Sequence, residues 1–127
     1  MIRVLIVDDQ PAFRRQLRAL LTRAGFDVVE ARDIAEAEKQ VRDAHPDLAV
    51  VDVMLPEING LDGAPRLRAI APALRTILVS AYPDRADLFR SAAKQVGAEA
   101  FFAKDDLDLE VVRAWNTNAA MSNKAAP

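Results

Sequence analysis

Four short apolar runs in this chain each end at a polar residue, and this pattern limits the folds that the chain can adopt. Short runs rich in Val and Ile are typical of strands that are buried on both faces of a parallel sheet. The runs and the polar residues after them are 2–7 with Asp8 and Asp9, 48–51 with Asp52, 76–79 with Ser80, and 100–103 with Lys104. Because parallel strands end at one edge of a sheet, we expect these side chains to gather there.

The segments between these runs carry apolar residues at helical spacing. In the segment 10–25, Phe13, Leu17 and Leu21 fall on one stripe, and Pro11 suits the first turn of a helix. Further helices are expected over 33–44, 84–96 and from 105 or 106 to 115, and a further strand over 26–31. The alternation predicts an α/β, doubly wound (flavodoxin-like) fold, with a five-stranded parallel sheet in the order 2-1-3-4-5 flanked by five helices.

The remaining helix, which precedes Pro72, has an irregular start. Gly63 and Pro65 both stand where its first turns are expected. Either the helix starts late, with Pro65 near its first position, or it is distorted there, because proline inside a helix removes a hydrogen bond. Both alternatives are left open at this point.

Composition excludes several classes of protein. The chain has 127 residues, of which 51% are hydrophobic, so a packed single domain is expected rather than disorder. A net charge of −2 leaves no basic footprint for nucleic acid, and the lack of cysteine excludes disulfides and thiolate metal sites. The first apolar run is too short for a signal peptide or a membrane span, so we expect a cytoplasmic location and no membrane partner.

The predicted strand order brings three carboxylates together. The first and third strands are neighbours in the sheet, so Asp8, Asp9 and Asp52 converge although they are distant in the sequence. Such close carboxylates repel one another and need either a proton or a cation. Oxygen donors alone favour a hard ion such as Mg²⁺, and the backbone carbonyl of Met54 can complete the set of metal ligands.

Asp52 ends its strand at a loop, where a carboxylate can attack phosphorus and hold an acyl phosphate. The metal would bridge Asp52 and the phosphoryl group, while Ser80 and Lys104 take the remaining oxygens. A simpler interpretation of Asp8 and Asp9 is that they cap the following helix. Capping alone does not explain why polar residues end the other strands as well.

The chain resembles the receiver domain of bacterial two-component response regulators. The matching motifs are Val7-Asp8-Asp9, the run from Asp52 to Gly60, Ser80-Ala81, and Phe101-Phe102-Ala103-Lys104, and they span roughly residues 2–115. Each motif is weak alone. Together they are highly specific, since they occur in order and each stands at the end of an expected strand.

The resemblance implies a role for each site residue. Asp52 would be the phosphoacceptor, taking a phosphoryl group from a sensor histidine kinase, a phosphotransfer protein or a small donor. Asp9 would bind Mg²⁺ directly, Asp8 mainly through water, and Mn²⁺ or Ca²⁺ could substitute. The remaining roles are the switch hydroxyl for Ser80, the aromatic switch for Phe101 and phosphate pairing for Lys104.

The resemblance also implies a signalling domain rather than an enzyme with an external substrate. It would catalyse its own phosphorylation and dephosphorylation and switch between inactive and active conformations that control an output partner or effector. The output face would be formed by the helix 84–96, the strand 99–103 and the last helix. Homodimerisation is left open, and no direct nucleic-acid binding is expected. We expect the receiver domain at 1–118 and a flexible tail or truncated linker at 119–127.

Two features depart from the family pattern or tune it. Asp105 follows Lys104 where most members have proline, so a trans peptide bond, or else a strained cis bond, is expected there. Met54 and Tyr82 flank the site, and an apolar Met54 cannot position an attacking water, which favours slow loss of the phosphoryl group.

Three other functions fit the sequence less well. A haloacid-dehalogenase-like phosphatase needs a second acid two residues after the first, but Gln10 stands there, and the chain has no room for a cap domain. A flavin-binding flavodoxin-like module needs a small, hydroxyl-rich phosphate loop where this chain has two acids. A degenerate receiver that only binds partners would not need the acids, Ser80 and Lys104 together.

Overall fold

The computed structural model describes residues 1–82 and 85–116, in which strands and helices alternate along the chain. The strands are β1 (Arg3–Val7), β2 (Asp27–Ala31), β3 (Leu48–Asp52), β4 (Arg75–Ser80) and β5 (Ala100–Ala103). The helices are α1 (Pro11–Arg23), α2 (Ile34–Ala44), α3 (Gly60–Ile70), α4 (Ala86–Gln95), a short 3₁₀ helix η2 (Lys104–Asp106) and α5 (Leu109–Ala114). The alternation predicted from the sequence is therefore confirmed.

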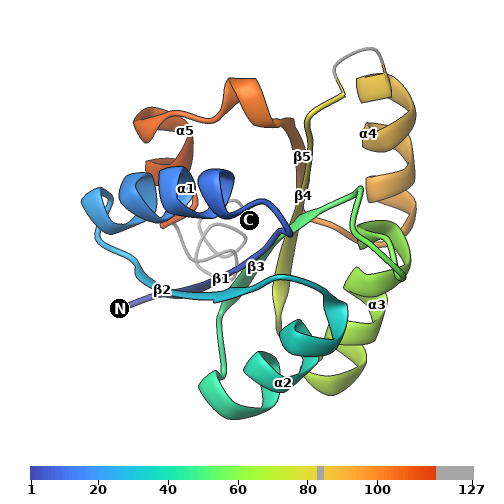
Figure 1. Ribbon diagram of the computed structural model, residues 1–127, viewed down its shortest axis with the longest axis horizontal. Coiled ribbons are helices and arrows are strands. Elements are labelled where there is room, and N and C mark those ends of the chain that lie inside the picture. Colours follow the sequence, from blue (N-terminus) through green and yellow to red (C-terminus); the bar gives the residue numbers. More distant parts are fainter. Residues whose placement is uncertain (83–84, 117–127) are drawn as a thin grey trace, which may run out of the picture.

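The strands form one parallel sheet in the order β2-β1-β3-β4-β5, as predicted (Figure 1). Asp52 pairs with Val79 across β3 and β4, and Ser80 pairs with Ala103 across β4 and β5. This register brings the polar ends of the strands to one edge. The reversal of strand order lies between β1 and β3, where parallel sheets hold their ligands.

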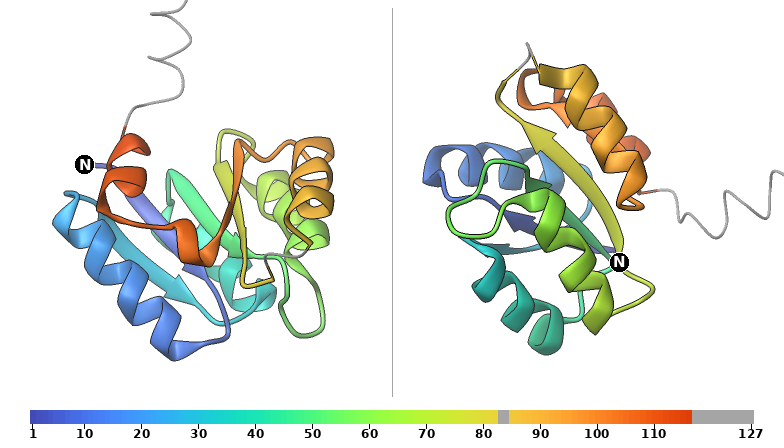
Figure 2. Two further views of the ribbon diagram at one scale, coloured as in Figure 1. Left: turned by 90° about the horizontal axis from the view of Figure 1, so that it is seen from above. Right: turned by 90° about the vertical axis from the view of Figure 1, so that its right-hand side faces the viewer.

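Two apolar cores fill the space between the sheet and its helices. Helices α1 and α5 cover one face of the sheet, while α2, α3 and α4 cover the other (Figures 1 and 2). Neighbouring strand residues enter opposite cores: Val50 faces α1 and α5, and Val51 faces α2 and α3. Strand β3 is buried along its whole length, which explains its continuous apolar sequence.

The structure of helix α3 excludes one of the two alternatives predicted for its start. It does not start late: it begins at Gly60, and Asn59 caps it by accepting a hydrogen bond from the Asp62 N–H at 2.9 Å. Pro65 consequently lies inside the helix, where it supplies no N–H to the carbonyl one turn before it. Gly63 lets α3 approach α2 closely, because a Cβ there would lie 2.5 Å from Ile34 Cγ1.

The C-terminal helix also differs from its predicted bounds. Neither Asp105 nor Asp106 opens it; these residues form the 3₁₀ helix η2 with Lys104. Helix α5 begins later, at Leu109, because Asp108 accepts a hydrogen bond from the Val111 N–H at 2.9 Å and acts as its N-cap. The peptide bond between Lys104 and Asp105 is trans, the first of the two alternatives given for it.

The described residues leave some predictions untested. The predicted first residue of α4, Asp84, and the predicted tail 119–127 lie outside them. Among the helices of residues 1–82 and 85–116, none combines the length and the apolar composition that crossing a bilayer requires.

Pro65 generates a prediction about stability. Pro65→Ala should raise the free energy of unfolding by about 1 to 2 kcal/mol, because alanine restores a helical hydrogen bond at an exposed position of α3. Urea denaturation measures the difference. The control is Pro72→Ala, beyond the end of α3, where proline suits the chain and no gain is expected. An equal gain in both variants would contradict this account.

Candidate metal and phosphoryl site at the carboxyl edge of the sheet

Asp8 is fixed by backbone contacts at the end of β1. Its N–H continues the sheet by donating to the Ala31 carbonyl at 3.0 Å, and its Oδ1 accepts a hydrogen bond from the Gln10 N–H at 2.8 Å. The side chain is fully buried, whereas the neighbouring Asp9 is exposed. One acid of the pair therefore belongs to the interior and the other faces solvent.

Asp52 is held in the same way at the end of β3. Its Oδ1 accepts a hydrogen bond from the Met54 N–H at 3.0 Å, and the residue is only 4% exposed. Ser80 repeats the pattern at the end of β4, since its Oγ accepts from the Tyr82 N–H at 3.1 Å. A bond to the N–H two residues ahead is the usual way in which aspartate and serine turn a chain.

The three carboxylates meet as the sequence predicted. One oxygen each of Asp8, Asp9 and Asp52 lies within 4.8 Å of the others. The turn bonds occupy Oδ1 of Asp8 and of Asp52, which leaves the Oδ2 atoms of both for the shared pocket. The arrangement places three oxygen donors around one small volume.

Lys104 faces two of these acids. Its Nζ lies 2.6 Å from Asp8 Oδ2 and 3.2 Å from Asp52 Oδ2, and its side chain is only 8% exposed. The Nζ also donates to Gln10 Oε1 at 3.3 Å, and it lies 4.2 Å from the centre of the Phe13 ring. The ammonium is thus enclosed by the pocket rather than solvated.

Asp8 Oδ2 provides a test of whether this pocket suits a cation. It is buried, and despite its short distance to Lys104 Nζ it accepts no hydrogen bond of ordinary geometry from the residues that the structure describes. A buried carboxylate oxygen without such a bond is costly unless a positive charge compensates it. Hard ions such as Mg²⁺ bind oxygen donors of this kind, so the residues present fit a divalent cation.

Charge repulsion and burial act together on Asp52. The pKa of its carboxyl group is raised to about 6: burial is the largest cause and the nearby Asp8 adds to it, while the Met54 N–H and the Lys104 ammonium act in the opposite direction. Without a further positive charge, the folded protein therefore favours a proton on this carboxylate more than the unfolded chain does.

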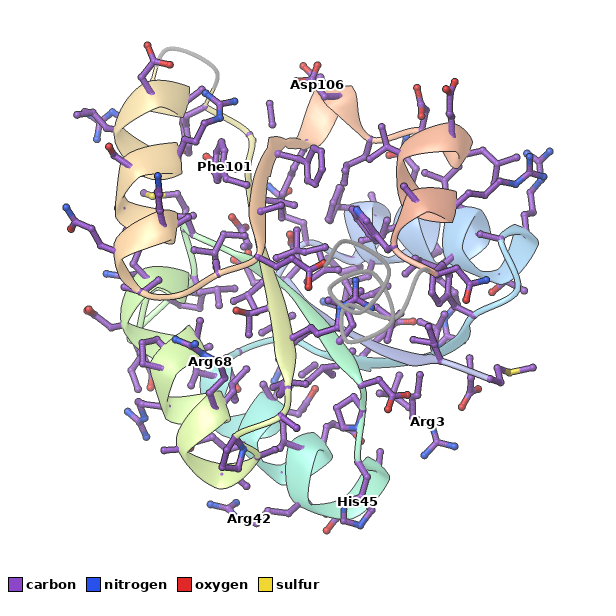
Figure 3. The ribbon with its side chains drawn as sticks, turned by 180° about the vertical axis from the view of Figure 1, so that it is seen from behind. Arg3, Arg42, His45, Arg68, Phe101 and Asp106 are labelled. Atoms are coloured by element: carbon purple, nitrogen blue, oxygen red, sulfur yellow. The ribbon has the colours of Figure 1, made fainter. Side chains whose placement is uncertain are left out.

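The other predicted residues lie around this pocket. Met54 and Tyr82 are both about half exposed, so their side chains border the site from the solvent side. Phe101 is buried between β5 and α4, with its ring centre 6.0 Å from that of Phe89 (Figure 3). Phe102 points to the opposite face of the sheet and packs on Trp115, so the two phenylalanines do alternate.

Gly60 supports the site in a way that the sequence did not single out. A Cβ at this position would overlap the backbone carbonyl of Asp52, lying 2.9 Å from its carbon and 3.1 Å from Val51 Cγ1. The Gly60 N–H also donates to the Val53 carbonyl at 2.9 Å. In the sequence Gly60 stands out only as the last residue of the motif that begins at Asp52, and its close contact with the backbone of Asp52 is a role that the sequence did not show.

Arg14 is a further residue that sequence reasoning missed. Its Nη1 donates to the backbone carbonyl of Asp8 at 2.6 Å, and its Nε binds Glu30 Oε1 at 2.9 Å. Burial raises the pKa of Glu30, but hydrogen bonds from Arg18 and Arg14 outweigh it and lower that pKa. The only sequence signal for this role was an arginine one turn after the two acids.

Comparison with known proteins identifies the family. A family model described as the response regulator receiver domain matches residues 4–114. The chain belongs to this family. Members are signalling domains of two-component systems that accept a phosphoryl group on an aspartate, bind a divalent metal at an acidic pocket, and interact with histidine kinases and output domains.

The relatives of this receiver domain fall into two groups, one about as long as the chain and one considerably longer. It is 35% identical over 115 residues to the chemotaxis protein CheY of Thermotoga maritima, covering 90% of this chain and 94% of CheY. It is 38% identical over 132 residues to the DNA-binding transcriptional activator DevR/DosR of Mycobacterium tuberculosis, covering 99% of this chain but 60% of that protein. The chain spans between 50% and 60% of the transcription regulators among these relatives.

Solved structures agree with this assignment. The receiver domain of the response regulator NarL from Mycobacterium tuberculosis is 33% identical with a TM-score of 0.79, and the match covers 90% of this chain and 92% of that one. A response regulator from Burkholderia pseudomallei, solved with a phosphorylated aspartic acid, a calcium ion and citrate, is 25% identical with a TM-score of 0.81, over 99% and 72% of the two chains.

The raised pKa of Asp52 predicts how the stability of the receiver domain depends on pH. Because the folded pKa of about 6 exceeds the ordinary value of 3.8, ionisation of Asp52 destabilises the fold above about pH 6 and has no effect below about pH 4. Without divalent cation, Asp52→Asn should therefore be more stable at about pH 8, by on the order of 2 kcal/mol, and no more stable at about pH 4. Urea denaturation at a series of pH values measures this, and a constant difference would contradict it.

The contact of Gly60 with the backbone of Asp52 predicts unequal costs for two glycines of α3. Gly60→Ala should lower the free energy of unfolding by about 1 to 3 kcal/mol, since the added carbon meets rigid backbone. Gly63→Ala should cost less, because the added carbon meets the Ile34 side chain rather than backbone, and alanine favours the helix by about 1 kcal/mol. Urea denaturation of both variants checks this, and the order of the two losses is decisive.

Proposed function

We propose that Asp52 of this receiver domain accepts the phosphoryl group of a two-component pathway, in a reaction that requires a divalent cation. The observation that carries this proposal is the meeting of Asp8, Asp9 and Asp52 with the buried Lys104 ammonium. If the cluster had only a structural role, its acids would be left repelling one another. A bound metal ion together with a phosphoryl group balances the charges of the acids and the lysine.

The proposed reaction transfers the phosphoryl group between two nucleophiles. The Asp52 Oδ2 attacks the phosphorus of a phosphohistidine, an O–P bond forms, the P–N bond breaks, and the imidazole nitrogen keeps the electron pair. Asp52 Oδ1 stays bound to the Met54 N–H, which keeps the carboxylate oriented. Later attack of water on phosphorus returns Asp52 and releases inorganic phosphate, so the domain would catalyse its own phosphorylation and dephosphorylation.

Each charged residue of the pocket would have a separate role in binding the metal or the phosphoryl group. Asp9, the exposed acid, would hold Mg²⁺ directly together with Asp52 and the Met54 carbonyl, while Asp8 acts mainly through water. When bound, the cation neutralises the charge that spreads over the phosphoryl oxygens, and Mn²⁺ or Ca²⁺ could replace it. The calcium ion and phosphorylated aspartic acid of the Burkholderia pseudomallei relative support this assignment. Within the pocket, the Lys104 ammonium would exchange its contacts with the acids for one with a phosphoryl oxygen.

Ser80 and Phe101 would convert phosphorylation into a conformational signal. Ser80 Oγ accepts from the Tyr82 N–H in this structure, and its own hydrogen is free to turn toward a phosphoryl oxygen. Phe101 already lies inward, between β5 and α4, and its ring packs near Phe89 of α4. A shift of this ring would therefore reach α4. The phosphoryl group thereby supplies the differential contacts that an equilibrium between inactive and active conformations needs.

The partners follow from the same chemistry. We assign the phosphoryl donor to a sensor histidine kinase or a phosphotransfer protein, and the output to the face formed by α4, β5 and α5. Some relatives are DNA-binding regulators, but they extend well beyond this match, so nucleic-acid binding is not assigned to this domain. Homodimerisation, a cytoplasmic location and a domain boundary at residue 118 stay predictions.

Labelling with a small phosphoryl donor tests the proposal. With Mg²⁺ and acetyl phosphate, the intact mass of the protein should increase by one phosphoryl group. The increase should vanish with a chelator and in Asp52→Asn, because each removes a component of the reaction. The matched control is Asp47→Asn, an exposed acid at the opposite end of β3, which should be labelled like the original protein. Labelling of Asp52→Asn at the original rate would overturn the assignment.

A further inference from the structure

The surroundings of the Lys104 ammonium include two neutral groups besides the acids. The Phe13 ring centre lies 4.2 Å from Nζ, and Gln10 Oε1 accepts a hydrogen bond from it at 3.3 Å. An ammonium within about 6 Å of an aromatic ring face is attracted by the ring, and the attraction grows when water is excluded. With its side chain only 8% exposed, Lys104 meets that condition.

Both neutral groups come from the start of α1. Gln10 is the N-cap of this helix and Pro11 its first residue, which places Phe13 in its first turn. Residues three apart lie on one side of a helix, so Gln10 and Phe13 approach Lys104 together. The Gln10 side chain makes no capping hydrogen bond to the helix, which leaves its amide available to the ammonium.

Neutral partners can keep the Lys104 ammonium in place when the acids bind something else. Asp8 and Asp52 hold the ammonium by opposite charge, and a cation or a phosphoryl group at the pocket would compete for those same oxygens. The Phe13 ring attracts it without offering an oxygen for which a cation would compete and without neutralising its charge. A lysine stem is long and flexible, so a fixed neighbour is needed if the ammonium is to stay in place after its acids are engaged elsewhere.

We propose that Phe13 is a positioning residue, which keeps the Lys104 ammonium in the pocket, ready to bind a phosphoryl oxygen while Asp52 is being phosphorylated. Gln10 supports the same position through its side-chain oxygen. This inference rests on the proposed function, since Lys104 must bind the phosphoryl group for its placement to matter.

A plain packing role is the alternative for Phe13. The ring is partly buried and packs against the core that α1 and α5 share, so its removal would also loosen that core. The experiment must therefore separate a loss of packing from a loss of the contact with Lys104. Phe26 offers a matched control, because it lies in the same core, just before β2 and away from the site.

The test compares the initial rates at which acetyl phosphate labels each variant at saturating Mg²⁺, and intact mass measures the labelling. Phe13→Leu should be labelled about five to ten times more slowly, a factor that corresponds to roughly 1 to 1.4 kcal/mol. Phe13→Tyr keeps an aromatic face and should retain most of the rate. Phe26→Leu makes the same chemical change elsewhere in the core and should be labelled at the original rate.

A second comparison uses Lys104→Ala. In that background Phe13→Leu should cause no further slowing, because the ring no longer has an ammonium to hold. Equal slowing with and without Lys104, or an original rate in Phe13→Leu, would overturn the proposal. If labelling of Lys104→Ala is too slow to time, the order of the Phe13 and Phe26 variants decides.

The outcomes also separate this inference from the function on which it rests. Failure of the original protein to be labelled would contradict the proposed function itself. Normal labelling that depends on Asp52 but is indifferent to Phe13 would contradict only the positioning role.

Discussion

The site depends on the attraction between the Lys104 ammonium and the two buried carboxylates of Asp8 and Asp52. Packing the ends of β1 and β3 side by side forces these acids together, and burial raises the pKa of Asp52 as a result. The ammonium offsets part of that cost but not all of it. A fold that keeps such an uncompensated pocket loses stability there and gains a place where a cation and a phosphoryl group are favoured.

Local geometry makes this pocket possible. At the ends of β1, β3 and β4 the same device recurs: the polar side chain accepts a hydrogen bond from the N–H two residues ahead. This bond turns the chain away from the sheet and also leaves the second carboxylate oxygen of Asp8 and of Asp52 free. Support from outside the pocket, by Arg14 on the Asp8 carbonyl and by Gly60 against the backbone of Asp52, fixes where those oxygens lie.

The errors of prediction had specific physical causes. Pro65 left two alternatives open for α3, a late start or a distorted one, and the late start was wrong because Asn59 caps the helix ahead of Gly60 and Pro65 lies inside it. The start of α5 was ambiguous because several aspartates offer caps, and Asp108 makes the bond while Asp105 and Asp106 stay in a 3₁₀ helix. In both cases several local signals competed, and the helix starts after the residue whose side chain accepts a bond from the N–H three residues ahead.

The sequence by itself determined the strands, the helices and the polar residues that end the strands, because apolar periodicity and turn chemistry depend on near neighbours in the chain. Together with the usual order of doubly wound parallel sheets, that pattern predicted the strand order. It thereby determined that Asp8, Asp9, Asp52 and Lys104 share one edge of the sheet. Only the tertiary structure decided that Phe13 and Gln10 contact Lys104 and that Gly60 lies against Asp52, since packing between distant segments depends on how the helices settle on the sheet.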